Sequence, residues 1–324
     1  MRRLGSPLLV LGVLLSLMLG LSAGAVPLSL QEVWSGVWRS DADAAVIVRQ
    51  LRAPRVLLAF LVGGSLGVCG AALQAMIRNP LAEPYLLGLS GGAGLGAVIA
   101  IASRMAGPWA VPVAAFIGAV AAVGLVYRLS LVAGRRMDPR VLLLSGVVVG
   151  SFAGALMSAI IVLSDASGVR NAFLWLLGGF GSASWKSLGV FAVYAVLPLA
   201  IIGLSARSLD LIALGEEPAH HLGAEVERTR RVIYLCTALL TAAGVAACGI
   251  IGFVGLVVPH AVRTVSRPLH RTLLPMVFLA GGSFLVLADV VSRTVVRPLE
   301  LPVGVITALV GVPLFALLLR RTLA

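Results

Sequence analysis

The chain has 324 residues, of which 60% are hydrophobic and only 12% are charged, and its formal net charge is +12. Soluble domains are typically about a quarter charged, so this composition excludes an ordinary soluble protein. A basic chain can bind nucleic acid, but membrane proteins collect arginine in their cytoplasmic loops. We therefore expect a membrane protein with lipid as its solvent and no nucleic-acid partner.

Ten apolar stretches follow one another along the chain, and their interiors carry no charged residue. A bilayer-spanning helix needs about 20 apolar residues, and only helices and closed barrels satisfy the backbone in lipid. The stretches are continuous and not alternating, which favours helices. We predict an all-α polytopic membrane protein with about ten transmembrane helices, forming a single domain over residues 1–324. The expected spans are 7–26, 56–77, 84–103, 109–127, 141–163, 187–204, 232–248, 250–262 (the shortest), 272–290 and 302–319.

The first span has two interpretations. Arg2 and Arg3 precede it, and Ala23-Gly24-Ala25 resembles the cleavage site of a signal peptide. The run from Pro7 to Val26 is nevertheless long enough to cross a bilayer, and nine apolar segments follow it. We interpret it as a retained first span, with cleavage as the alternative.

The basic residues predict the orientation of the chain. With the N-terminus inside and an even number of spans, 16 of the 25 basic residues fall on the cytoplasmic side. This excess predicts that both termini are cytoplasmic. Arg49, Arg52 and Arg55 break the rule, because they cluster on the outer side before the second span. Anchoring to lipid headgroups is one explanation for them.

Glycines at four-residue spacing predict tight packing between helices, because small residues let transmembrane backbones approach closely. Three spans carry the pattern: Gly63 and Gly67; Gly88, Gly92 and Gly96; and Gly146, Gly150 and Gly154. The run Gly88-Leu89-Ser90-Gly91-Gly92 also matches the nucleophile elbow of serine hydrolases. That elbow needs a preceding strand and a later Asp and His, so we prefer packing as its role.

Several kinds of chemistry have no candidate residues. The cysteines and histidines lack metal-ligand spacing, so we expect neither a metal site nor a cofactor. The span interiors hold no relay of ionisable residues, which proton-coupled transporters and membrane enzymes need. The only lysine, Lys186, follows Trp185 and not the glycine of a phosphate-binding loop. We therefore expect no catalytic residue, and any ATP must bind to another chain.

One polar segment, about 207–231, interrupts the apolar pattern between cytoplasmic arginines. Glu216 and Glu217 can begin a helix, because acidic side chains favour the N-terminal dipole. Gly223 can end it. We predict a pair of short surface helices here, with a solvated loop as the alternative.

Ordered motifs give the chain a family resemblance. They are Leu51-Arg52-Ala53-Pro54-Arg55, Gly70-Ala71-Ala72-Leu73-Gln74, Asn79-Pro80-Leu81-Ala82-Glu83-Pro84, Leu87-Gly88, Ser90-Gly91-Gly92-Ala93, Leu176-Leu177-Gly178-Gly179, Leu214-Gly215-Glu216, Gly252-Phe253-Val254-Gly255-Leu256-Val257-Val258-Pro259-His260 and Glu300-Leu301-Pro302-Val303-Gly304. With these motifs the chain resembles the permease subunits of ABC importers for iron–siderophore complexes, haem and cobalamin. The resemblance runs from about Arg49 to Leu319.

The resemblance implies a type II ABC importer permease fold with ten helices, in which helices two to five and seven to ten form inverted repeats. It implies a homodimer in the bacterial inner membrane, with two cytoplasmic ATPase subunits and an extracytoplasmic substrate-binding protein. The expected function is import of a metal chelate by alternating access. An iron–siderophore complex is the first expectation, and haem or cobalamin stays open. The rival interpretations are an ion-coupled secondary transporter and a membrane enzyme or receptor.

The resemblance also implies functional residues. The expected ATPase contacts are Gly215, Glu216, Glu217, Ala219, Leu222 and Gly223. The expected contacts with glutamates of the binding protein are Arg52, Arg55 and Arg293, while Arg297 has no matching role. The expected residues of the translocation path, on the fifth span, are Ser145, Gly146, Gly150 and Ser151.

Overall fold

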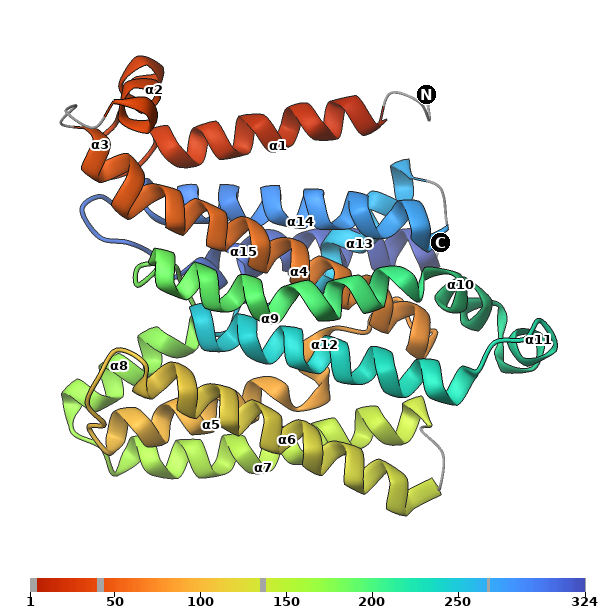
Figure 1. Ribbon diagram of the computed structural model, residues 1–324. Coiled ribbons are helices and arrows are strands. Elements are labelled where there is room, and N and C mark those ends of the chain that lie inside the picture. Colours follow the sequence, from red (N-terminus) through yellow and green to blue (C-terminus); the bar gives the residue numbers. More distant parts are fainter. Residues whose placement is uncertain (1–4, 40–43, 135–137, 267–268, 324) are drawn as a thin grey trace.

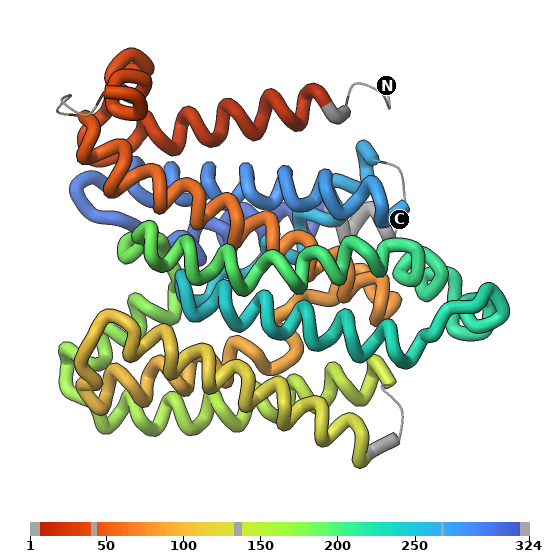
Figure 2. The backbone as a smooth tube through the Cα atoms, in the orientation of Figure 1, coloured from red at the N-terminus to blue at the C-terminus, as the bar shows by residue number. Residues whose placement is uncertain are grey.

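A computed structural model describes residues 5–39, 44–134, 138–266 and 269–323, and these residues form helices and connections without a strand. Figures 1 and 2 show the long helices running side by side as one bundle. The elements are α1 (Gly5–Ser22), α2 (Leu30–Trp38), α3 (Ala44–Val46), η1 (Ile47–Arg52, a π-helix), α4 (Ala53–Ile77), η2 (Pro84–Leu87, a 3₁₀ helix), α5 (Leu89–Ala102), α6 (Ala110–Gly134), α7 (Pro139–Val162), α8 (Ala166–Leu176), α9 (Trp185–Leu204), α10 (Ala206–Leu214), α11 (Glu216–His221), α12 (Val226–Cys248), α13 (Val254–Val265), α14 (His270–Ser292) and α15 (Val303–Leu323).

Each predicted span corresponds to a helix. Within the described residues, six helices are long and apolar enough to cross a membrane, and four further apolar helices are shorter. The expected short eighth span is α13, with 12 residues. The second span begins earlier than predicted, because the helical run already starts at Ala44. Sequence reasoning missed α2 and α8, which are short helices outside the predicted spans.

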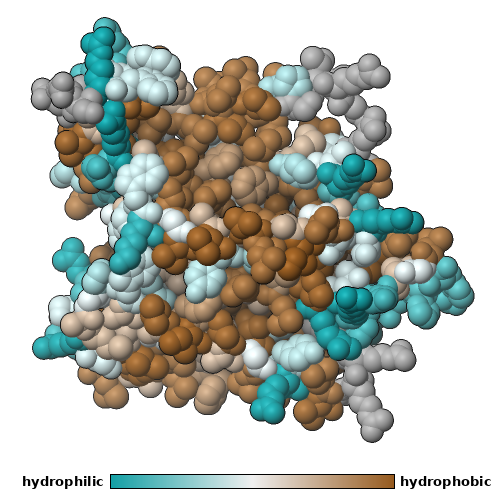
Figure 3. Space-filling model, viewed as in Figure 1, coloured by the Kyte–Doolittle hydropathy of each residue, from teal (hydrophilic) through white to brown (hydrophobic). Residues whose placement is uncertain are grey.

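The bundle has two distinct ends. The pair α10 and α11 projects from one end, and the start of α1 and the end of α15 lie on the same side (Figure 1). At the opposite end lie α2, α3 and α8. Figure 3 shows hydrophobic surface across the middle and hydrophilic residues gathered towards both ends, as expected of a protein whose waist lies in lipid. An even number of crossings explains why the chain begins and ends on one side.

The centre of the bundle is the crossing of α4 and α14, which is built from a repeated pentapeptide. Residues 60–64 read Phe-Leu-Val-Gly-Gly, and residues 278–282 read Phe-Leu-Ala-Gly-Gly. A methyl group on Gly63 would overlap the carbonyl oxygen of Gly281, and one on Gly281 would lie 2.5 Å from the oxygen of Gly63. The second glycine of each motif faces the phenylalanine ring of the other helix. The two helices therefore touch backbone to backbone in a reciprocal arrangement.

The predicted glycine faces are confirmed in part. Gly92 of α5 packs against the backbone of Gly118 in α6, and Gly96 packs against Ala114. Gly146 of α7 packs against the backbone of η2. The prediction was wrong for Gly154, where an added methyl would meet none of the described atoms within 4 Å. The spacing alone cannot tell which turn of a helix lies at the crossing.

We predict that Gly70→Ala strongly destabilises the fold. A methyl group there would overlap the carbonyl oxygen of Gly255, a backbone atom that cannot swing aside. Overpacking costs about 1–3 kcal/mol where side chains can adjust, and a backbone clash should exceed that range. The measurement is the thermal midpoint of the purified protein in detergent. Gly154→Ala is the matched control, and a Gly70→Ala variant that melts like this control would contradict the interpretation.

Candidate functional site

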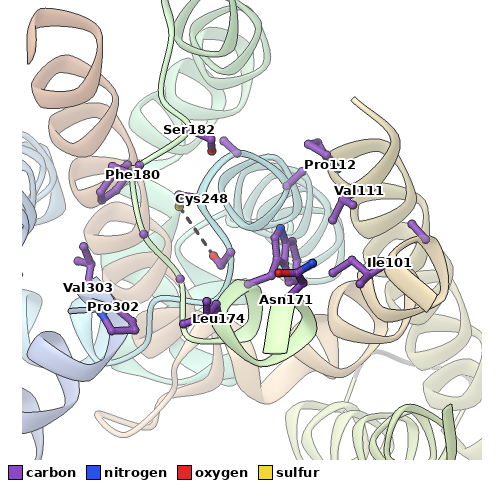
Figure 4. Close-up of a pocket in the computed structure, with 18 of the residues that line it drawn as sticks. Ile101, Val111, Pro112, Asn171, Leu174, Phe180, Ser182, Cys248, Pro302 and Val303 are labelled. Atoms are coloured by element: carbon purple, nitrogen blue, oxygen red, sulfur yellow. Dashed lines mark hydrogen bonds between the residues drawn. The ribbon is translucent and has the colours of Figure 1, made fainter. Parts of the chain in front are cut away.

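A cavity of about 850 Å³ lies at the end of the bundle that carries α8. Its walls come from the facing ends of α5 and α6, from α8, from residues 178–182, from the end of α12 and from residues 300–303. In Figure 4, side chains from these segments surround the space, with Asn171 beside Leu174 on one wall and Pro302 beside Val303 on another. The charged residues on the wall are of both signs: Arg55, Arg104, Asp165 and Glu300.

The chain around the cavity is irregular, and its backbone groups pair across segments. The amide of Gly179 donates to the carbonyl of Cys248 at 2.7 Å. At the start of α15, the amide of Val303 donates to Gly178 at 3.0 Å and that of Gly304 donates to Leu177 at 3.1 Å. Non-helical backbone is tolerated at membrane depth only where protein or a water-filled cavity satisfies it. These bonds tie the start of α15 to the cavity wall.

Two breaks between helices are joined by polar side chains. The carboxylate of Glu83, between α4 and α5, accepts the amide of Phe253 at 2.6 Å. The hydroxyl of Tyr85 accepts the amide of Ile251 at 3.2 Å, so both bonds satisfy the break between α12 and α13. Burial raises the pKa of Glu83, and the Phe253 amide opposes that rise. Sequence reasoning quoted Glu83 only as part of a motif and missed this role.

Four charged residues near the cavity form a cluster that we call the charge clamp: Arg55, Asp289, Arg293 and Glu300. The carboxylate of Asp289, 1% exposed, lies 2.9 Å from an Nη of Arg55 and 3.2 Å from the Nε of Arg293. The other side of the Arg55 guanidinium meets Glu300 at 2.9 Å. Two positive and two negative charges balance, so the clamp joins α4, α14 and the segment before α15 without an unpaired buried charge.

Three arginines at this end also bind the carbonyl ends of helices. Arg52 donates to the carbonyls of Leu21 and Ser22 at 2.7 and 2.8 Å, and Arg293 donates to Gly20 at 2.8 Å. Arg49 does the same for Gly36 and Val37 of α2, at 2.9 and 2.7 Å. The last four carbonyls of a helix lack partners within the helix, and cations are favoured there. Removal of α1 would leave the guanidinium of Arg52 without these acceptors.

These contacts show where the structure places the predicted outer arginines. Arg52 and Arg293 are each only 5% exposed, and their contact with a binding protein stays a prediction. Arg293 and Arg55 lie close together, because both bind Asp289. Sequence reasoning gave Asp289 no partner, although its i,i+4 spacing from Arg293 was a usable signal.

At the opposite end, the predicted pair of short helices is confirmed as α10 and α11. Glu216 and Glu217 occupy the first turn of α11. Gly215 and Gly223 flank the helix with φ values of 131° and 81°, which β-branched residues resist. The side chain of Ala219 is fully buried, and its contact with the ATPase stays a prediction. Glu217 and Leu222 are exposed.

One ion pair and one hydrogen-bonded aspartate tie this helix pair to the bundle. Glu216 pairs with Arg230 of α12, whose side chain is only 7% exposed. Asp210 of α10 accepts the backbone amide of His270 at 2.9 Å and contacts its Nδ1 at 2.6 Å. His270 is the first residue of α14. Movement of α10 and α11 is therefore linked directly to α12 and α14, a connection that sequence reasoning missed.

The chain matches the FecCD transport family over residues 9–321. It belongs to that family. A cobalamin import permease of Halobacterium salinarum is 44% identical, over 86% of this chain and 74% of its own. A hemin transport permease of Yersinia pestis is 39% identical, over 97% of this chain and 96% of its own. A solved ABC transporter described as metal-chelate type, in an inward-facing conformation, has a TM-score of 0.86 at 28% identity, covering 99% of this chain and all of its own.

Membership of the FecCD family confirms the predicted identity as a multi-pass permease subunit of an ABC importer with the type II fold. The permeases of this family are not enzymes, and ATP hydrolysis belongs to a separate chain.

Within this FecCD fold, the predicted path residues on α7 divide into two groups. Ser145 and Gly146 are buried, and Gly146 packs against η2. Ser151 is exposed beside Val147 and Val148. The assignment of these residues to the translocation path stays a prediction.

We predict that Asp289→Asn destabilises the protein more than an exposed carboxylate change does. Asparagine keeps the shape but leaves the guanidiniums of Arg55 and Arg293 facing each other with reduced compensation. Breaking a buried ion pair costs about 3–5 kcal/mol. The thermal midpoint in detergent measures this loss. Asp165→Asn is the control, since Asp165 pairs with Arg104 on the surface. Equal midpoints for the two variants would show that the clamp does not stabilise the fold.

Proposed function

We propose that this permease imports a bulky metal chelate by alternating access, as a homodimer with two ATPase subunits and an extracytoplasmic binding protein. One observation carries the proposal. A projecting helix pair and a cavity of about 850 Å³ occupy opposite ends of one membrane bundle. ATP-driven import needs both an ATPase contact on one side and an entrance for cargo on the other. The arginine distribution supports the orientation that we propose, in which α10, α11 and both termini are cytoplasmic. The membrane in this proposal is a bacterial inner membrane.

The candidate cargos are cobalamin, haem and a ferric siderophore complex. The relatives named above supply the first two, and the motif resemblance supplies the third. All three are large chelates, and a cavity of this size suits that class better than a single ion. Its wall combines apolar residues with paired charges. Paired charges attract a ligand only weakly, so this wall favours passage over tight binding.

The test is uptake by proteoliposomes that contain the permease with its ATPase and binding protein. We expect ATP-dependent accumulation of one of the three labelled chelates, and no ATP hydrolysis by the purified permease alone. Uptake that follows an ion gradient without ATP would favour a secondary transporter. ATP turnover by the permease alone would overturn the proposal.

We propose that the binding protein docks on the end that carries α2, α8 and residues 293–302. Arg52, Arg55 and Arg293 were predicted as direct contacts. A glutamate of the partner would have to compete with Asp289 or with helix carbonyls to reach them. Arg55 is the most accessible of the three, at 13% side-chain exposure, and Glu300 already binds it. The arginines would then shape the docking surface more than they contact the partner.

We propose that the ATPase docks on α10 and α11, with Glu217 and Leu222 as exposed contacts and Ala219 packed beneath them. Glu216 would act by holding α11 on Arg230. Of the predicted path residues, Ser151 and Gly150 suit a path between two copies of α7, because small side chains leave space and bind weakly.

We predict that Gly215→Val or Gly223→Val uncouples transport without preventing folding. Valine resists the positive φ that both positions need, so α11 should tilt or fray while the bundle remains. The measurement is ATPase binding by co-purification, together with chelate-stimulated ATP turnover. Gly203→Val is the matched control. Gly203 lies near the end of α9 that leads into α10, is exposed, and lacks a positive φ. Unchanged binding and turnover in both test variants would return this segment to the role of an ordinary loop.

A further inference from the structure

A second hollow lies between α6 and α9. Both helices pack on α12, which forms the floor, and they meet each other through the rings of Phe116 and Tyr194, whose centroids are 5.6 Å apart. The hollow has a volume of about 540 Å³. We call it the α6–α9 groove. Neighbouring surface on α9 is strongly apolar, with Val193 77% exposed, so the groove opens on the lipid-facing side of the bundle.

The groove is polar at one end and apolar at the other. At its mouth, the ammonium group of Lys186 lies 5.4 Å from the centre of the Trp109 ring. Ser184 and Ser187 also line the mouth. Deeper in, the lining passes to Val113, Phe116 and residues of α12. None of the described lining residues is acidic, and Lys186 is the charged side chain among them. The hydroxyl of Ser184 donates to that of Ser187 at 3.2 Å, and the hydroxyl of Ser187 donates to the carbonyl of Ser184 at 2.9 Å, so the positive charge at the mouth comes from Lys186.

The length of the groove matches one leaflet of a bilayer. Lys186 at the mouth and Tyr194 at the closed end are eight residues apart on α9, which corresponds to about 12 Å of helix. Half of the hydrocarbon core of a bilayer is about 15 Å. Lysine and tryptophan are residues of the membrane–water interface. The mouth therefore sits where headgroups lie, and the closed end sits near the ends of acyl chains.

We propose that the α6–α9 groove binds an anionic phospholipid. One acyl chain lies between α6 and α9 against α12, and the phosphate meets the ammonium group of Lys186. The arrangement favours a lipid over a partner helix, because the ring contact of Phe116 with Tyr194 closes the groove before it could accept a full span. The site lies in the leaflet away from α10 and α11. Pro108, Pro112 and Ser182 line both this groove and the larger cavity, so the lipid also completes a wall of that cavity.

Native mass spectrometry of the full-length permease, with added phosphatidylglycerol or phosphatidylethanolamine of the same acyl chains, tests the proposal. We expect one retained phosphatidylglycerol per chain, bound about tenfold more tightly than phosphatidylethanolamine, a difference of about 1.4 kcal/mol. Lys186→Gln should reduce this preference to near parity, and Lys186→Arg should keep it. Val113→Trp should fill the groove and displace both lipids. Val113 is 51% exposed, so the fold tolerates the larger ring.

Two controls separate the groove from general lipid contact. Val193→Trp adds the same ring to the lipid-facing side of α9 outside the groove, and Arg297→Gln removes a charge elsewhere at this end. Both should bind phosphatidylglycerol like the wild type. The proposal is overturned if Lys186→Gln and Val113→Trp retain the wild-type preference, or if the controls lose lipid equally. A stoichiometric polypeptide in place of the lipid would also overturn it.

Discussion

The carboxylate of Asp289 is the point through which one end of this bundle is connected. It is almost fully buried between two guanidiniums, where an unpaired charge would be too costly to keep. Through Arg55 it reaches α4 and Glu300, and through Arg293 it reaches the end of α1. Four separate parts of the chain meet at this one carboxylate. The cavity wall, the start of α15 and the packing of α1 all depend on the charges being matched there.

The glycine crossings impose a second constraint, of shape and not of charge. In lipid, no hydrophobic effect drives helices together, so close backbone contact and satisfied polar groups must do so. The α4–α14 crossing supplies the first, and Glu83 and Tyr85 supply the second at the helix breaks. The two ends of the bundle then carry different features: the cavity at one end, and α10 and α11 at the other. Asp210 and Glu216 connect the projecting helices to α14 and α12, two helices that extend towards the cavity end.

The sequence was sufficient for the ten apolar helices, the short α13, the α10–α11 pair and the family, because hydrophobic runs, acidic first turns and ordered motifs are local signals. It was insufficient for side chains whose role depends on distant partners. The sequence does not show that Arg52 and Arg293 donate to carbonyls of α1, because these groups are distant in sequence. It also does not show that the side chain of Ala219 is buried. The docking and path residues remain predictions, since they concern surfaces that other chains complete.

The bond from Arg293 to Gly20 spans 273 residues of sequence, and this separation bears on how the protein is made. During synthesis α1 leaves the ribosome long before Arg293, which supplies one of the donors for its last turn. At roughly 5–20 residues per second, that interval is on the order of tens of seconds. Arg52 can already donate to Leu21 and Ser22, but until Arg293 arrives the carbonyl of Gly20 lacks this donor. Final docking of the first helix is therefore a late event in biogenesis, which follows the insertion of α14.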